Sequence, residues 1–340
     1  MRPGETTLRR LLAPIQGPLD HPETTELIIQ KPGEVGIEQR GKWQWINVPE
    51  FDFKRLDAIS LLAGRLLSKD FDAAHPIVET TLPGRHRYTA IRPPITPEGT
   101  ISITIRKPKD SVSPPKEQDF CNVSDNARHL VERHDPADEE LLRLYHAKEW
   151  TAFFELAVRS RKTIAATGQQ FSGKTTFLRK IMQAMPPEDR VVTVEDTDEF
   201  LDLPVGPDMR PMRNRVSMIY GAADVTAEKA ILTTLRMRAD RVAIQELRGA
   251  EAYAFLRIHA AGQRGSFATW HAHPHDPFTP LALMVRSHPN GREIPSEDLP
   301  VMLREAVDIV AYCYRNPVTD EFATPASVYF RLADAQPSPG

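Results

Sequence analysis

The sequence is poor in cysteine and contains no long apolar run. Its two cysteines, Cys121 and Cys313, are too few for a disulfide framework or a four-cysteine zinc site, so we expect a reducing compartment. The apolar run near the C-terminus, from Ile309 to Tyr314, is far shorter than the roughly 18 residues that a membrane-spanning helix needs. No apolar segment of signal-peptide type follows Met1. We therefore expect a soluble, cytoplasmic protein that would have to be recruited if it acts at a membrane.

An excess of basic charge is also missing. The formal net charge is −3, which argues against a protein that holds duplex DNA mainly by bulk charge. Aromatic residues make up only 7% of the chain, and no basic track with interleaved aromatics indicates a single-strand translocase. Proline, by contrast, is abundant at 30 residues, which predicts many turns and extended connections.

The length and the hydrophobic patterns predict two domains. A chain of 340 residues is too long for one ordinary core. Residues 1–106 combine alternating, strand-like segments with helical spacing at 53–67, which predicts a small α/β domain. Residues 107–136 are rich in proline and charge without periodicity, which is typical of a linker. In residues 137–335, a helical segment (137–159) precedes short apolar strands that alternate with helices, which predicts a mostly parallel sheet, and residues 336–340 should form a disordered tail.

The strongest chemical signal is a phosphate-binding loop. Its residues match the pattern G-x-x-x-x-G-K-[ST] and are followed by Thr176: Gly168, Gln169, Gln170, Phe171, Ser172, Gly173, Lys174 and Thr175. A predicted strand precedes the loop and a predicted helix follows it, so backbone N–H groups can surround phosphate oxygens. Lys174 would neutralise the β- and γ-phosphates of ATP, and the Thr175 hydroxyl would bind Mg²⁺. Phe171 is unusual, because a bulky residue stands where such loops usually prefer glycine.

Two glutamates end predicted strands of the same sheet. Glu195 follows Val191 to Val194, and Glu246 follows Val242 to Gln245. Ligands bind at the carboxyl edge of such sheets, and we expect both strands to flank the phosphate loop. Glu246 is the candidate that holds Mg²⁺ through water, and Glu195 the candidate that orients or deprotonates the attacking water.

Three histidines, His271, His273 and His275, stand close together after a further predicted strand. No acid or cysteine lies at a characteristic ligand spacing from them, which disfavours a metal site. We favour a single histidine, His271, as a sensor of the γ-phosphate.

In this order the motifs resemble those of the secretion-superfamily ATPases. The resemblance is carried by Gly168 to Thr176, Val194 to Thr197, Leu235 to Arg241, Gln245 to Ala252, and Gly265 to Ala272. Segments of the first half, including Arg92-Pro93-Pro94 and Ile105 to Pro108, resemble the N-terminal domain of the hexameric traffic ATPase of type IV secretion and conjugation machines. The sequence departs from that family at Phe171, at Gln245 for the usual glycine, and at Gln30 where asparagine is common.

The resemblance implies a RecA-like ATPase domain in a homohexameric ring, with nucleotide between the N- and C-terminal domains. Arg87 and Arg106 occupy the positions of N-terminal arginines that reach the phosphates in that family. A permanently charged, fork-shaped guanidinium can stabilise charge on a transferring phosphoryl group. The implied partners are inner-membrane secretion components and coupling ATPases, at the cytoplasmic face of the inner membrane. No sequence-specific nucleic-acid binding is implied.

Three other functions are compatible with parts of the sequence. A type II secretion or type IV pilus motor is disfavoured, because such motors commonly carry a tetracysteine zinc element. A nucleic-acid translocase with a RecA-like core is disfavoured by composition. A docking ring that binds nucleotide with little turnover is supported by Phe171 and Gln245.

Overall fold

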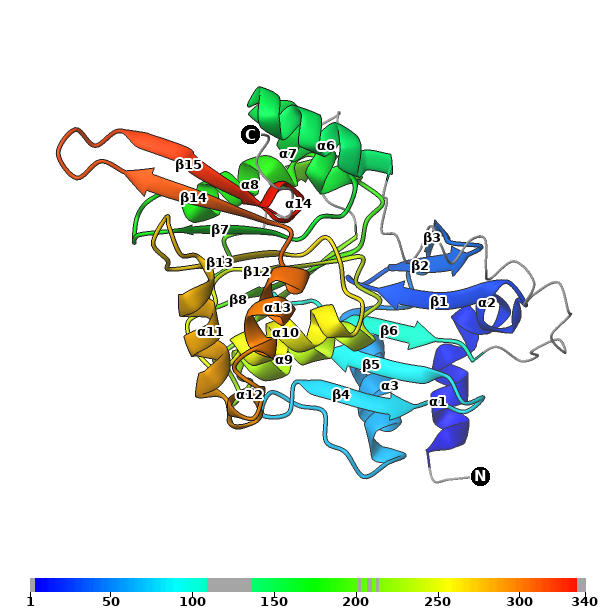
Figure 1. The fold of residues 1–340 in the computed structure, drawn as a ribbon. Coiled ribbons are helices and arrows are strands. Elements are labelled where there is room, and N and C mark those ends of the chain that lie inside the picture. Colours follow the sequence, from blue (N-terminus) through cyan, green and yellow to red (C-terminus); the bar gives the residue numbers. More distant parts are fainter. Residues whose placement is uncertain (1–3, 109–135, 201–202, 207–209, 212–213, 335–340) are drawn as a thin grey trace, which may run out of the picture.

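The computed structural model describes residues 4–108, 136–200, 203–206, 210–211 and 214–334. These residues form two sheets, one in the N-terminal half and one in the C-terminal half, each with its own helices (Figure 1). Nearly all of the expected linker falls on 109–135, which lies outside the described residues, as does the expected tail. The domain boundaries therefore stay predictions.

The N-terminal sheet is antiparallel, in the order β3-β2-β1-β6-β5-β4. Its strands are β1 (Thr24–Ile29), β2 (Glu34–Gln39), β3 (Lys42–Asn47), β4 (Ile77–Thr81), β5 (Arg87–Ile91) and β6 (Ser102–Arg106). Its helices are α1 (Glu5–Leu12), η1 (Ala13–Ile15), α2 (Gln16–Asp20) and α3 (Phe53–Arg65).

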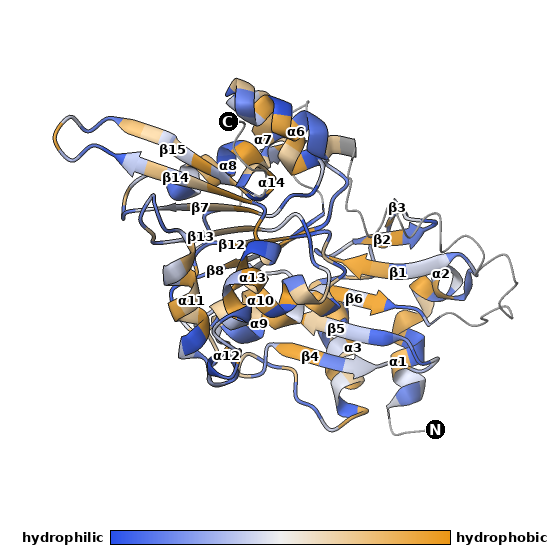
Figure 2. Cartoon of the chain, viewed as in Figure 1, coloured by the Kyte–Doolittle hydropathy of each residue, from blue (hydrophilic) through white to orange (hydrophobic). Residues whose placement is uncertain are grey.

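The two faces of this sheet differ because apolar and polar residues alternate along its strands. One face packs with α1 and α3 in a core that includes Leu27, Ile105 and Leu56. The other face carries a row of charged partners across four strands: Glu38, Glu26, Arg106 and Arg87. Two of the strands, β1 and β6, show their apolar residues clearly in Figure 2.

The C-terminal sheet has the order β11-β8-β12-β13-β7-β14-β15, and every pair is parallel except β14 with β15. Its strands are β7 (Ile164–Gly168), β8 (Val191–Glu195), β11 (Arg215–Ile219), β12 (Arg241–Ile244), β13 (Phe267–Trp270), β14 (Ile309–Arg315) and β15 (Phe322–Phe330). A small separate pair consists of β9 (Pro204–Val205) and β10 (Arg210–Pro211). This arrangement confirms the expected fold class of a small α/β domain followed by a mostly parallel sheet.

Helices cover the C-terminal sheet and connect its parallel strands. They are α6 (Pro136–Ala147), α7 (Trp150–Arg159), α8 (Lys174–Met182), α9 (Ala227–Thr233), η2 (Thr234–Arg236), α10 (Ala252–Ala260), α11 (Phe278–Ser287), α12 (Pro289–Arg292), α13 (Asp298–Ala306) and α14 (Arg331–Asp334). Within the described ranges, no helix is both long and apolar enough to cross a membrane.

Three sequence expectations need correction. The helical segment 137–159 is two helices, because Lys148 adopts a left-handed conformation (φ 58°) between α6 and α7. Sequence patterns missed β11 and the antiparallel hairpin of β14 and β15, which extends beyond the rest of the sheet (Figure 1). The expectation that the strands ending in Glu195 and Glu246 flank the phosphate loop is wrong, since β13 and β14 are the neighbours of β7.

The two sheets meet through polar contacts and through an apolar contact, in which Ile91 and Ile95 pack into the core of the C-terminal sheet. Arg238 donates to Glu38 Oε1 at 2.5 Å, and Arg190 donates to the Thr104 hydroxyl at 3.3 Å. Gln30 Nε2 donates to Asn214 Oδ1 at 2.8 Å. Arg190 directly precedes β8, so the polar face of the N-terminal sheet faces the amino edge of the C-terminal sheet, opposite the edge at which β7 ends.

Glu26 lies within this interface and is only 4% exposed. Burial raises its pKa to about 7, and the neighbouring Glu38 carboxylate acts in the same direction. Three guanidinium groups, those of Arg106, Arg238 and Arg190, oppose the shift. The folded protein therefore favours the protonated form of Glu26.

Because of the Glu26 carboxyl group, we expect the stability of the fold to fall as pH rises. Its folded pKa of about 7 exceeds the ordinary value of 4.5, so its contribution is fully present below pH 4.5 and is lost as pH rises through 7. The loss should amount to roughly 3 kcal/mol at most. Urea unfolding at several pH values should show it in the wild type and much less in Glu26→Gln. The exposed Glu98→Gln is the control, and parallel curves for wild type and Glu26→Gln would contradict the assignment.

Candidate nucleotide site

The phosphate-binding loop connects β7 to α8 at the carboxyl edge of the parallel sheet. Gly168 ends β7 with φ 144°, and Gly173 precedes α8 with φ 85°. Both values lie where a side chain is strained, which explains glycine at these two positions. The loop therefore presents backbone N–H groups and the N-terminus of α8 to a bound phosphate.

Lys174 is folded back into its own loop. Its Nζ donates to the Gln169 carbonyl at 2.9 Å and to the Gly168 carbonyl at 3.4 Å, and the residue is only 8% exposed. Burial lowers the pKa of Lys174, and the nearby Glu246 carboxylate opposes that shift. When a phosphate binds, Lys174 would therefore give up its hydrogen bonds to these carbonyl groups and pair with the charged phosphate oxygens.

His271 connects the loop to Glu246. It directly follows β13, and its Nδ1 lies 3.1 Å from the Gly168 carbonyl oxygen and 3.5 Å from Lys174 Nζ. Its Nε2 lies 2.8 Å from Glu246 Oε1. Glu246 reaches the loop in this way although β12 is separated from β7 by β13. The structure thus brings together three of the residues predicted from sequence: Lys174, His271 and Glu246.

The Glu195 carboxylate is engaged elsewhere. It is completely buried and accepts hydrogen bonds from the Thr193 hydroxyl at 2.5 Å and from the Glu199 and Phe200 N–H groups at 2.7 and 3.0 Å. The remaining contacts come from β11: Arg215 Nη2 and the Ser217 hydroxyl, each at 3.3 Å. Burial raises the pKa of Glu195. The structure therefore places this carboxylate between β8 and β11, three strands from β7, and does not bring it to the loop.

Two further side chains of the site were not recognised as functional from sequence. Arg248 donates to Glu246 Oε2 through Nε at 2.7 Å and to Asp196 Oδ2 through Nη1 at 2.6 Å. Gln245 Oε1 accepts from the Asp196 and Thr197 N–H groups at 2.8 and 3.3 Å. Arg248 thus orients Glu246, and Gln245 fixes the segment after β8. The adjacency of Arg248 to Glu246 was the available signal for the first, whereas Gln245 stood out in the sequence only as a departure from the family's usual glycine.

Arg87 and Arg106 lie in the other domain. They are cross-strand partners on the polar face of the N-terminal sheet, at the end where β6 points away from the C-terminal sheet (Figure 1). The Arg106 side chain is 66% exposed, and its Nε lies 3.6 Å from Glu26 Oε1. The structure does not bring either arginine to the phosphate loop of the same chain.

The remaining loop residues have distinct environments. Ser172 is buried, and its hydroxyl donates to the Gln169 carbonyl at 2.8 Å. Thr175 is half-buried in the first turn of α8, and Thr176 is exposed. Phe171 has a left-handed backbone (φ 59°) and a side chain that is 73% exposed, so it faces solvent and not the interior of the loop.

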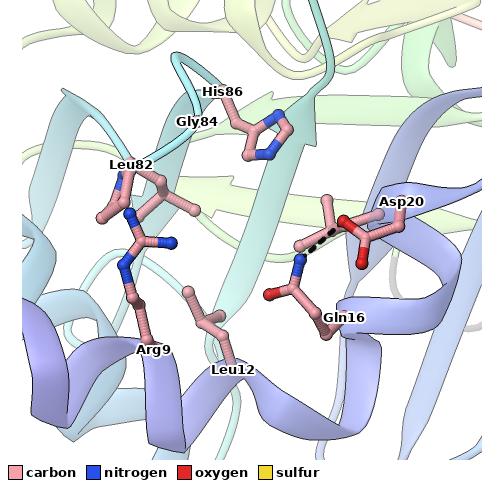
Figure 3. A pocket seen from close by; sticks show the side chains of 9 residues that line it. Arg9, Leu12, Gln16, Asp20, Leu82, Gly84 and His86 are labelled. Carbon is pink, nitrogen blue, oxygen red and sulfur yellow. Dashed lines mark hydrogen bonds between the residues drawn. The ribbon is translucent and has the colours of Figure 1, made fainter.

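Two cavities lie apart from the loop. One, of about 180 Å³, lies between α1, α2 and the turn before β5; Arg9 and His86 line it, and Gln16 donates to Asp20 at its side (Figure 3). The other, of about 190 Å³, lies between the two sheets and includes Arg215. Neither cavity is lined by residues of the phosphate loop.

The geometry at the start of the loop predicts that alanine will lower the free energy of unfolding much more at Gly168 than at Gly262. In Gly168→Ala the new methyl group would overlap the Cys313 carbonyl oxygen of β14, so the two strands would have to separate. In Gly262→Ala the backbone is also left-handed (φ 94°), but no atom lies within 4 Å. We expect Gly262→Ala to lower the free energy of unfolding by about 1 kcal/mol and Gly168→Ala by about 3 kcal/mol or more. Urea unfolding measures both, and equal losses would show that the contact with β14 is not the constraint.

Comparison with known proteins agrees with this geometry. The family model described as "Type II/IV secretion system protein" matches residues 136–278. The chain is 33% identical over 311 residues to the type IV secretion system protein VirB11 of Brucella suis biovar 1, covering 89% of this chain and 84% of that protein. It is 36% identical over 312 residues to protein VirB11 of Agrobacterium fabrum, covering 89% and 88%.

A solved structure extends the similarity to both domains. The crystal structure of the VirB11 ATPase from the Brucella suis type IV secretion system, in complex with sulphate, matches 98% of this chain and 98% of that chain. The TM-score is 0.85 and the sequence identity is 31%. The chain therefore belongs to the VirB11 family of type IV secretion ATPases.

Proposed function

We propose that this chain is the ATP-hydrolysing ring motor of a type IV secretion or conjugation machine, which powers pilus assembly and the transfer of protein or protein–DNA substrates. The observation that carries the proposal is the contact chain from Lys174 through His271 to Glu246 at the phosphate loop. It places a cation, an imidazole and a carboxylate next to one anion-binding loop, which is what phosphoryl transfer to water requires.

Each residue of the loop has a role in this proposal. Backbone N–H groups and the N-terminus of α8 bind the phosphates, and Lys174 exchanges the Gln169 carbonyl for the β- and γ-phosphate oxygens. His271 is placed to sense the γ-phosphate, because it contacts both the Gly168 carbonyl of the loop and the Glu246 carboxylate. The Glu246 carboxylate orients the attacking water, and Arg248 holds that carboxylate in place.

Mg²⁺ fits the donors of this site. Thr175 supplies a hydroxyl and Glu246 a carboxylate, and both are oxygen ligands of the kind that Mg²⁺ prefers. Among the residues that the structure describes, no group of three or more acids, histidines and cysteines could hold a metal by itself. This agrees with an ion that keeps several waters and binds mainly through nucleotide phosphates. When bound, it would neutralise charge on the β- and γ-phosphate oxygens.

We propose a homohexamer in which Arg87 and Arg106 act on the nucleotide of a neighbouring subunit. Both lie on the polar face of the N-terminal sheet, at the end of β6 that points away from their own ATPase domain, and Arg106 is largely exposed. A head-to-tail interface repeated around a ring could bring them to the next phosphate loop. The proposed ring works at the cytoplasmic face of the inner membrane, with membrane components and coupling ATPases as partners.

The first experiment compares the wild type with Lys174→Ala. Within the described part of the chain, the hydrogen bonds of Lys174 go to its own loop and to His271, so we expect the variant to keep its fold and lose steady-state ATP hydrolysis by about 100-fold or more. Phosphate release and far-UV circular dichroism measure the two properties. Equal turnover in both proteins would show that this loop is not the catalytic site, and negligible wild-type turnover would favour a docking ring.

Substitutions of the two glutamates should have different effects on stability and turnover. Glu246→Gln should retain stability and ATP binding while losing turnover by about 100-fold, and its Mg²⁺ dependence should shift. Glu195→Gln should lose about 1–3 kcal/mol of stability, because an amide group would set N–H donors against the buried donors that Glu195 accepts from. A stable Glu195→Gln protein that binds ATP without hydrolysing it would instead assign the role of the base to Glu195.

Mixing two inactive variants tests the arginines. Lys174→Ala has intact arginines and Arg106→Ala has an intact loop, so a mixed ring would contain some complete sites if Arg106 acts on its neighbour. We expect the mixture, after subunit exchange, to recover part of the wild-type turnover. Light scattering with ATP and Mg²⁺ should confirm a hexamer for each protein. An inactive mixture of exchanged hexamers, or a fully active monomer, would contradict the proposal.

A further inference from the structure

The phosphate loop lies between a side that carries His271 and Glu246 and a side formed by β14 and β15. In the sheet order, β13 and β12 lie on one side of β7 and contribute His271 and Glu246. On the other side lie β14, whose Cys313 is in register with Gly168, and then β15. A nucleoside triphosphate is charged at its γ-phosphate end and aromatic at its base. Its charged end fits the side with Lys174, so the base would extend toward β14 and β15.

Two exposed phenylalanines lie at the phosphate loop. Phe171 belongs to the loop itself and is 73% exposed. Phe322 begins β15 and is 55% exposed, although its ring packs next to the loop: a β-carbon added at Gly173 would lie 3.6 Å from Phe322 Cδ1. The hairpin that carries Phe322 also shows apolar residues near its outer end (Figure 2). Two large apolar side chains thus remain in solvent beside the site that binds phosphate.

Phe322 is held in a defined position. The Arg315 guanidinium lies 5.3 Å from the centre of the Phe322 ring, and Arg315 is itself ion-paired with Asp320 at 2.5 Å. Thr324, also on β15, lies 3.2 Å from a β-carbon added at Gly173. The beginning of β15 is therefore fixed against the loop by contacts on both sides.

Among the residues that the structure describes, the Phe171 ring belongs to none of the hydrophobic core clusters. The residue's φ of 59° is strained for a phenylalanine, and its ring is not buried in the core. A strained residue that exposes an aromatic ring next to a binding loop is typical of a ligand contact. Aromatic rings bind nucleobases by stacking, without discriminating strongly among them.

We propose that Phe171 forms the stacking surface for the nucleobase of the bound nucleotide, and that Phe322 forms the adjoining wall. This inference rests on the proposed function, because it requires that the loop bind the triphosphate. It assigns to Phe171 a role in nucleotide affinity and not in the chemical step.

The test compares two ligands that differ by the nucleoside. Titration calorimetry with Mg²⁺ and either ATP or inorganic tripolyphosphate would be performed on wild type, Phe171→Ala, Phe171→Tyr and Phe322→Ala. Phe171→Ala should weaken ATP binding by about 10-fold and leave tripolyphosphate binding almost unchanged. Phe171→Tyr keeps an aromatic ring and should bind ATP about as tightly as the wild type. Phe322→Ala should lose less ATP affinity than Phe171→Ala, again without a change in tripolyphosphate affinity. Leu283→Ala, which removes an apolar side chain that is 64% exposed on α11, is the matched control.

Three outcomes would overturn the proposal. Unchanged ATP affinity in Phe171→Ala would exclude stacking. Equal losses for both ligands would show that the substitution distorts the loop. Loss of the oligomer in Phe171→Ala, with unchanged nucleotide affinity, would assign the ring to a contact with a second copy of the chain. The same titrations distinguish a wrong inference about Phe171 from a wrong proposed function. If the loop does not bind the triphosphate, the wild type will bind neither ligand, or Lys174→Ala will bind both as tightly as the wild type.

Discussion

The close approach of the Gly168 backbone to β14 is the constraint on which the nucleotide site depends. It sets the direction in which the chain leaves β7, and it requires a residue without a side chain because the Cys313 carbonyl occupies the space. The same turn directs the Gly168 carbonyl toward Lys174 and His271. Displacing β7 from β14 would therefore disturb the strand pairing and both of these contacts together.

The charges of the site are arranged as a connected network. Lys174, His271, Glu246, Arg248 and Asp196 follow one another at contact distances, from the loop to the segment after β8. Charges of opposite sign alternate along the second half of this network, so each carboxylate is oriented by a donor before any ligand arrives. Such preorganised charge costs little rearrangement when a phosphoryl group departs, which is the physical basis of its value in catalysis.

The N-terminal sheet shows how one alternating pattern serves two purposes. Its apolar face forms a core with the helices, and its polar face provides residues such as Glu38 and Thr104 for contacts beyond the sheet. Some of these contacts go to the amino edge of the ATPase domain through Arg238 and Arg190. Arg106 remains largely exposed at the end of the row. These polar contacts join the two domains beside an apolar contact, in which Ile91 and Ile95 pack into the core of the C-terminal sheet.

Local signals in the sequence determined the fold class, the phosphate loop and most of the parallel strands, because each depends on a short pattern of apolar residues, glycines and one lysine. Lys174, His271 and Glu246 could be chosen because they follow strands whose carboxyl ends meet at one edge. From sequence, Glu195 was the candidate for orienting the attacking water and Glu246 for holding Mg²⁺, but both end buried strands in acids, so no local pattern separates their positions. Only the tertiary structure separated them: the strand order puts β8 three strands from β7, where β11 supplies Arg215 and Ser217 to Glu195. The placement of Arg106, Gln245 and Phe322 likewise depends on long-range pairing, which no local pattern of residues encodes.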